Sequence, residues 1–197
     1  EGGLTSLAVS GDGELVATCG RDGGVRLWRA ADGAPVLGFE ANSQVVRAVA
    51  FVPGDQAVAS AGDDGAVRVW RLEETARAEE MATGGDAVMA VDLSADGRYL
   101  AAAGWGGLAV WGLRRRSELW RAPAADGAVR AVAISPDCRH VASAGDDPTV
   151  RLWALDSGRP LRALFGHEGA VRALAFTPYG RFLLSAGTDA TLKLWDL

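Results

Sequence analysis

The chain has 197 residues, of which 49% are hydrophobic and 23% are charged, a balance typical of a globular protein and not of a disordered one. Its formal net charge of −5 at pH 7 disfavours nucleic acid and anionic membranes as partners. Two cysteines are too few for a disulfide framework, and the sequence has neither a membrane-spanning apolar run nor a secretory signal, so we expect a cytoplasmic or nuclear protein that is not secreted.

The first predicted elements are four short strands separated by turns. They are the apolar or alternating segments at residues 4–9, 15–18, 25–28 and 36–39. Gly, Asp and Pro residues punctuate the stretches around them, and segments of this length and spacing are typical of successive antiparallel strands. The third strand ends in Trp28.

This group of strands recurs along the whole chain. Phrases similar to Val25-Arg-Leu-Trp28 end at Trp70, Trp111, Trp153 and Trp195, each 41 or 42 residues after the one before. Phrases similar to residues 4–9 recur in the same register at residues 46–51, 88–93, 129–134 and 171–176. A fixed period over the full length predicts a repeat architecture of five units, with tight turns such as Gly62–Gly65 and Gly145–Pro148 between the second and third strands.

One segment locally contradicts the all-β pattern. Residues 73–81, Glu-Glu-Thr-Ala-Arg-Ala-Glu-Glu-Met, have the composition and charge spacing of a helix. The repeat register nevertheless assigns them to the last loop and fourth strand of the second unit. We therefore predict a strand there.

The five units resemble the WD40-repeat family, and the last unit matches it best. It carries Gly166-His167, then Ser185 and Asp189, and finally Trp195-Asp196. The resemblance implies a β-propeller with one four-stranded antiparallel blade per repeat. It also implies that His167, Ser185, Asp189 and Trp195 form a buried, hydrogen-bonded structural tetrad.

The other units keep only part of this tetrad. Unit one has Thr18, Asp22 and Trp28, unit two has Ser60, Asp64 and Trp70, and unit four has Ser143, Asp147 and Trp153. Asn42 and Ala125 stand where units two and four would have the histidine. Unit three has Ala102 at the serine position, a deletion near Gly106 and no aspartate, so we expect its blade to be the most irregular.

The predicted fold is therefore an all-β, WD40-type propeller forming a single domain over residues 1–197. Its repeats span about 1–42, 43–84, 85–125, 126–167 and 168–197. The units supply five sets of the first three strands but only four fourth strands. A closed five-bladed ring with one incomplete blade is one interpretation. The absence of an initial Met and the end of the chain after Trp195-Asp-Leu197 favour the other, an arc of a larger propeller with exposed apolar faces on its first and last blades.

Catalytic, metal and cofactor sites are not predicted. Ser185, His167 and Asp189 have the composition of a hydrolytic triad, but their spacing matches the structural tetrad and no Gly-x-Ser-x-Gly motif accompanies them. Two histidines without a Cys-x-x-Cys pair do not suggest a metal site, and no glycine-rich phosphate-binding motif is present.

Partner-binding candidates come from positions that vary while the scaffold repeats. By resemblance, one face of the propeller presents the residue before the Asp of each unit and the second residue of each first strand. These candidates are Arg21, Arg47, Asp63, Met89, Trp105, Arg130, Asp146, Arg172 and Thr188. Arginine, aspartate and an exposed aromatic suit a peptide-docking surface, although the arginines could instead pair with the neighbouring aspartates. Arg114–Arg116 is expected to be a solvated loop and Trp120 to cap the side of the propeller.

The function predicted from the sequence is a non-catalytic scaffold for protein or peptide partners. The alternative is a regulatory sensor domain of a larger protein with a kinase, nuclease or nucleotide-hydrolysing effector. Other blades or domains of the same full-length protein are further expected partners. A hydrolytic or lyase propeller would need a central cluster of histidines and carboxylates, which the sequence lacks.

Overall fold

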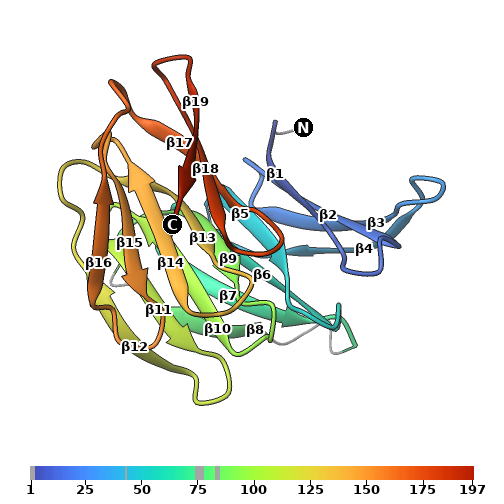
Figure 1. Ribbon diagram of the computed structural model, residues 1–197. Helices are drawn as coiled ribbons and strands as arrows, with labels where there is room; N and C mark the ends of the chain where they lie inside the picture. The colour runs from blue at the N-terminus through green and yellow to red at the C-terminus, as the bar shows by residue number, and fades with distance from the viewer. Residues whose placement is uncertain (1–2, 43, 74–77, 83–84) are drawn as a thin grey trace. The chain divides into compact units, whose positions relative to one another are not determined.

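The computed structural model describes residues 3–42, 44–73, 78–82 and 85–197, and within them every helix or strand assigned is a β-strand (Figure 1). The strands form five sheets in which consecutive strands are neighbours, so that the order within each sheet follows the chain. We call these sheets blades 1 to 5. No helix in the described part of the chain is long and apolar enough to cross a membrane.

The first four blades have four strands each, and blade 5 has three. Blade 1 comprises β1 (Leu4–Val9), β2 (Leu15–Gly20), β3 (Gly24–Arg29) and β4 (Pro35–Glu40). Blade 2 comprises β5 (Val46–Phe51), β6 (Ala57–Gly62), β7 (Ala66–Arg71) and β8 (Ala78–Ala82). Blade 3 comprises β9 (Val88–Leu93), β10 (Tyr99–Gly104), β11 (Gly107–Gly112) and β12 (Ser117–Ala122). Blade 4 comprises β13 (Val129–Ile134), β14 (His140–Gly145), β15 (Val150–Ala154) and β16 (Pro160–Leu164), and blade 5 comprises β17 (Val171–Phe176), β18 (Phe182–Gly187) and β19 (Leu192–Asp196).

The chain divides into two compact units. Unit 1 is Glu1–Val91 and contains blades 1 and 2, whereas unit 2 is Asp92–Leu197 and contains blades 4 and 5. The boundary falls within β9, the first strand of blade 3, so β10 to β12 belong to unit 2.

The expected strands are confirmed. The first strand of every repeat has the bounds that the sequence pattern predicts, and the fourth strand is present in four of the five sheets. In residues 73–81, the helical composition does not prevail: Ala78–Ala82 forms β8, while residues 74–77 lie outside the described residues.

Neighbouring blades pack face to face within each unit. In unit 1, Val25 and Leu27 of β3 share a hydrophobic core with Val49 of β5 and Val58 of β6. In unit 2, Val150 and Leu152 of β15 share a core with Val171 of β17, and Leu174 and Phe176 pack against it. The face of one blade therefore lies against the first strand of the next, as stacking repeats require to bury both faces of a sheet.

Blade 3 differs from the others chiefly in one turn. Its sheet has all four strands, and Gly104 of β10 pairs directly with Gly107 of β11, which leaves a two-residue hairpin at Trp105-Gly106. Gly107 has a φ of 98°, and a Cβ at this position would lie 2.2 Å from the Ala122 carbonyl oxygen. Only glycine fits there, so the deletion seen in the sequence is absorbed by a shorter turn and not by loss of a strand.

Candidate interaction surface and the buried tetrads

A β-bulge near the start of the first strand positions the candidate residues. In blades 1, 2, 4 and 5 the register with the second strand shifts across the second residue of the first strand, which is Thr5, Arg47, Arg130 or Arg172. A bulge bends the strand and re-aims the side chain that it carries. Three of the four bulged residues are arginines that the sequence analysis singled out.

A backbone hydrogen bond brings a second candidate beside each bulge. The amide of the residue before the tetrad Asp donates to a carbonyl just ahead of the first strand: Arg21 to Gly3 (3.1 Å), Asp63 to Val45 (2.9 Å), Asp146 to Ala128 (3.0 Å) and Thr188 to Ala170 (2.8 Å). The turn between the second and third strands is thus tied to the entry of the first strand. The two sets of candidates become neighbours within each of these blades.

In unit 1 this arrangement produces an ion pair in blade 2. Arg47 donates from Nε to Asp63 Oδ1 and from Nη2 to Asp63 Oδ2, both over 2.7 Å. The hydrogen bonds that Arg47 donates to this carboxylate raise the pKa of Arg47 above its ordinary value. Arg21 is exposed in blade 1, and Met89 is half-buried.

In unit 2 one carboxylate serves two arginines. Arg130 donates from Nε and Nη2 to both oxygens of Asp146, with Nη2 2.9 Å from Oδ2. Arg172 Nη1 from blade 5 lies 3.9 Å from Asp146 Oδ1, and the Ala128 amide donates to Oδ2 over 3.1 Å. The hydrogen bond from Arg130 is the main cause that lowers the pKa of Asp146. The pairing of arginine with aspartate, left open by the sequence, is therefore present in blades 2 and 4.

Trp105 stands apart from the paired charges. It occupies the tip of the two-residue hairpin of blade 3 with 52% of its surface exposed, whereas the other six tryptophans are buried or half-buried. Thr188 is exposed in blade 5.

Trp120 and Arg114–Arg116 lie elsewhere in blade 3. Trp120 packs within unit 2, because its Nε1 donates to the Leu155 carbonyl over 2.8 Å and its ring lies 6.3 Å from that of Trp153. Arg114–Arg116 is exposed in the turn between β11 and β12, as expected.

The tetrad of blade 5 is a continuous hydrogen-bonded chain. Trp195 Nε1 donates to Ser185 Oγ over 2.9 Å, Ser185 Oγ lies 2.7 Å from His167 Nε2, and His167 Nδ1 lies 2.8 Å from Asp189 Oδ2. The tautomer with its proton on Nδ1 suits this chain, since Nε2 then accepts from Ser185 and Nδ1 donates to the carboxylate. Burial opposes ionisation of Asp189, but hydrogen bonds from the Glu168 amide, His167 and Thr191 outweigh it and lower the pKa of this carboxyl.

The same order of serine, histidine and aspartate would suit a hydrolase, but the surroundings do not. Ser185 and His167 are buried, and Ser185 Oγ already accepts the indole N–H of Trp195. A nucleophile needs access to substrate and an oxyanion site. The contacts of these residues tie the loop before β17 to β18 and β19.

Blade 2 builds an equivalent chain with asparagine. Trp70 Nε1 donates to Ser60 Oγ over 3.0 Å, Ser60 Oγ donates to Asn42 Oδ1 over 3.3 Å, and Asn42 Nδ2 donates to Asp64 Oδ1 over 2.7 Å. Asn42 stands where the repeat pattern has a histidine, yet the hydrogen-bonded chain is kept. The signal was available, because an amide side chain offers one acceptor and one donor group, as a neutral imidazole does.

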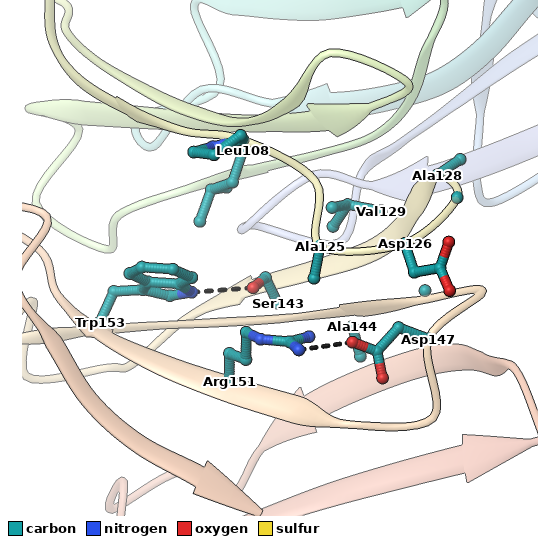
Figure 2. A pocket seen from close by; sticks show the side chains of 13 residues that line it. Leu108, Ala125, Asp126, Ala128, Val129, Ser143, Ala144, Asp147, Arg151 and Trp153 are labelled. Carbon is teal, nitrogen blue, oxygen red and sulfur yellow. Dashed lines mark hydrogen bonds and ion pairs between the residues drawn. The ribbon is translucent and has the colours of Figure 1, made fainter.

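Blade 4 has a small pocket at the position where blade 5 has His167 and blade 2 has Asn42. Ala125 supplies no polar group, Trp153 Nε1 donates to Ser143 Oγ over 2.8 Å, and Asp147 pairs with Arg151 of β15 (Figure 2). These five residues are among those lining a pocket of about 20 Å³. That volume is close to what a single water molecule requires.

An aspartate–arginine pair not predicted from the sequence is present in three of the blades that lack the tetrad histidine. Asp22 pairs with Arg26, Asp64 with Arg68, and Asp147 with Arg151, each four residues apart across the same hairpin. In blade 5 the corresponding residue is Lys193, and Asp189 hydrogen-bonds to His167 instead. Among the described residues, no group of three or more His, Cys, Asp or Glu side chains could hold a metal ion.

Five repeats, each forming one antiparallel blade, are the features by which the chain can be compared with known families. The family model described as "WD domain, G-beta repeat" (WD40) matches five times, at residues 1–29, 33–71, 80–111, 118–154 and 158–196. The chain belongs to the WD40-repeat family, and the resemblance noted from the sequence is confirmed.

Individual relatives match over a shorter stretch. Over 52 residues the chain is 46% identical to the small ribosomal subunit protein RACK1 of Brassica napus and, equally, to the small ribosomal subunit protein RACK1z of Arabidopsis thaliana. The matched stretch covers 26% of this chain and 16% of either relative. The chain is therefore similar to a small part of these proteins.

Proposed function

We propose that this chain is a non-catalytic scaffold that docks protein or peptide partners through the bulged ends of the blades in unit 2. The observation that carries the proposal is Trp105, which holds half of its surface in solvent at the tip of a rigid two-residue hairpin. A large aromatic side chain with a polar N–H is the residue type most often at the energetic centre of an interface.

The charged network of blades 4 and 5 supports the same interpretation. Arg130, Asp146 and Arg172 are one-quarter to one-half exposed, and Arg172 lies at the longer distance from the shared carboxylate. Arg172 can therefore turn toward an acidic group of a partner. The ion pair of Arg130 with Asp146 meanwhile holds these two side chains in position. The proposed docking residues of unit 2 are Trp105, Arg130, Asp146, Arg172 and Thr188.

In unit 1, Arg47 and Asp63 form the equivalent pair, and Arg21 and Met89 hold the equivalent positions. We propose these four as a second set of docking positions. The proposal includes a cytoplasmic location, which the names of the ribosomal relatives support. It includes no nucleic-acid or membrane partner, because the chain carries a net negative charge.

The test uses peptides selected on the wild-type chain from a random phage-displayed library. We expect Trp105→Ala to weaken the selected peptides by at least about tenfold, because it removes the exposed anchor. Tyr179→Ala is the matched control. Tyr179 is also an exposed aromatic, but it lies in the turn between the first and second strands of its blade, β17 and β18, whereas Trp105 lies in the turn between the second and third strands of blade 3.

Both variants should keep the melting temperature of the wild type, since both side chains are exposed. Equal affinity of the wild type and Trp105→Ala would overturn the proposal. So would a loss of affinity in Tyr179→Ala alone.

A further inference from the structure

The turn between β11 and β12 of blade 3 carries a motif that the proposed function does not use. It consists of the three arginines Arg114–Arg116 followed by Ser117, the first residue of β12. All four residues are exposed. Ser117 is the only serine or threonine in the sequence with arginine at each of the three preceding positions. A hydroxyl group therefore lies in solvent directly after a run of cations.

The carboxylate next to this serine is engaged elsewhere. Glu118 accepts from Arg121 Nε over 3.1 Å and from Arg121 Nη2 over 2.5 Å. In the part of the chain that the structure describes, neither Arg114 nor Arg115 forms a salt bridge. Because both guanidinium groups are exposed, the turn presents their charge to solvent.

The position of Ser117 in the sheet makes it accessible to an enzyme. The strand order β12-β11-β10-β9 places β12 at one edge of blade 3, and Ser117 pairs with Gly112 at the last position of the ladder. Arg116 has a φ of 52°, the left-handed backbone of the turn. Opening the end of a hairpin breaks few hydrogen bonds and leaves the rest of the sheet intact. An enzyme that binds an extended peptide can therefore take up residues 113–117 from the folded protein.

We propose that Ser117 is a phosphorylation site for a serine/threonine kinase that recognises arginines on the amino-terminal side of its substrate serine. Carboxylates in the substrate cleft of such a kinase would accept charge-assisted hydrogen bonds from Arg114 and Arg115. Ser117 Oγ attacks the γ-phosphorus of ATP, and the bond from this phosphorus to the oxygen that bridges to the β-phosphate breaks. ADP leaves, and the hydroxyl proton passes to the catalytic aspartate of the kinase. The site is separate from the proposed docking residues and does not depend on them.

The added phosphate would change the charge of the turn without displacing β12. A phosphoserine carries about −1.5 to −2 charge at pH 7 and would offset most of the charge of the three arginines before it. Its oxygens can accept hydrogen bonds from the neighbouring guanidinium groups. We therefore expect the phosphorylated protein to keep the melting temperature of the unmodified one.

The experiment incubates the folded chain with ATP, Mg²⁺ and the catalytic subunit of the cyclic-AMP-dependent protein kinase, an arginine-directed serine kinase. A synthetic peptide of residues 111–120 is the reference substrate. We expect the folded wild type to gain one phosphoryl group, located at Ser117 by tandem mass spectrometry, with a kcat/KM within about tenfold of that of the peptide. Arg114→Ala with Arg115→Ala should lower the kcat/KM of the folded chain by at least about tenfold, because the kinase loses both cations.

Ser157 supplies the matched control. It is exposed in the turn between β15 and β16, the equivalent turn of blade 4, but Asp156 precedes it in place of an arginine. Ser157→Ala should leave phosphate incorporation unchanged, whereas Ser117→Ala should abolish it. Both side chains are exposed, so neither change should prevent folding.

Four results would each overturn the proposal. The first is a folded wild type that stays unmodified while the peptide is phosphorylated, and the second is a peptide that is not phosphorylated either. The third is incorporation that survives in Ser117→Ala. The fourth is a kcat/KM that the two arginine substitutions leave unchanged.

Discussion

At the scale of single residues, the tetrads show that the side chain between the serine and the aspartate needs one acceptor and one donor group to link them by hydrogen bonds. In blade 5 an imidazole links Ser185 to Asp189, and in blade 2 a carboxamide links Ser60 to Asp64. Both side chains accept from a hydroxyl at one end and donate to a carboxylate at the other. Blade 4 has the same serine and aspartate but an alanine between them, so its link is broken at a single position.

We therefore expect Ala125→His to stabilise the protein. The imidazole would fill the pocket, accept from Ser143 and donate to Asp147, and a net gain of about 1 kcal/mol in the free energy of unfolding is reasonable for such bonds. Denaturant titration measures the gain. In a Ser143→Ala background most of the gain should disappear, because the new side chain then has lost one partner.

Ala125→Leu is the control for pocket filling alone. It adds volume without a donor or an acceptor. An equal gain in Ala125→Leu, or no gain in Ala125→His, would contradict the role assigned to the hydrogen-bonded chain.

The residues of the candidate surface could be chosen from the sequence, but their contacts could not. The repeat register put Arg47 and Asp63 at corresponding places in blade 2, as it put Arg130 and Asp146 in blade 4. The bulge that turns each arginine toward its aspartate leaves no mark in a pattern of alternating residues, because it depends on pairing between strands. Whether these arginines meet a partner as well as an aspartate stays a prediction.

At the scale of whole elements, tertiary pairing decides where local composition misleads. Residues 73–81 have helical composition, yet β8 forms because Glu80 pairs with Arg68 of β7 over 2.8 Å and Met81 is buried opposite Val67. Among the described residues of this segment, Glu79 and Glu80 pair across the sheet with Arg71 and Arg68 of β7. The first strands could be predicted to the residue, because an apolar phrase repeated five times outweighs any single local preference.

Asp92 gives β9 a property that the other first strands lack. The equivalent residues are Ala8, Ala50, Ala133 and Ala175. Asp92 Oδ2 accepts from the Ile134 amide of β13 over 2.7 Å, and Oδ1 accepts from the Leu93 amide over 2.9 Å. Burial raises the pKa of Asp92 to about 6, although these two amides act in the opposite direction.

A raised carboxyl pKa makes the folded state bind protons more readily than the unfolded state. The stabilisation is therefore complete below pH 4 and is lost as the pH rises through about 6. We expect the free energy of unfolding of Asp92→Ala to fall less between pH 4 and pH 7 than that of the wild type, by up to about 3 kcal/mol. Loss of the acceptor for the Ile134 amide is independent of pH and does not affect this difference. Parallel slopes in urea titrations at the two pH values would show that Asp92 does not titrate in this range.

At the scale of the whole molecule, acidic residues outnumber basic ones, and many arginines pair with carboxylates. The chain has 20 lysines and arginines against 25 aspartates and glutamates. Arginines in both units lie within salt-bridge distance of carboxylates, among them Arg26, Arg47, Arg68, Arg130 and Arg151. Surface pairs of this kind contribute little to stability, but they remove the positive patches that a polyanion would need.

This balance predicts weak binding to nucleic-acid-like polymers. On a heparin column at pH 7 the wild type should elute below about 100 mM salt, because the net charge is negative and arginines such as Arg47 and Arg130 already pair with carboxylates. An anion exchanger should retain it under the same conditions, since the net charge is −5. Arg114→Glu with Arg115→Glu, two exposed arginines in the turn after β11, should leave the heparin elution unchanged. Elution well above that salt concentration, with a shift in the double variant, would instead identify this turn as a polyanion site and contradict a function limited to protein partners.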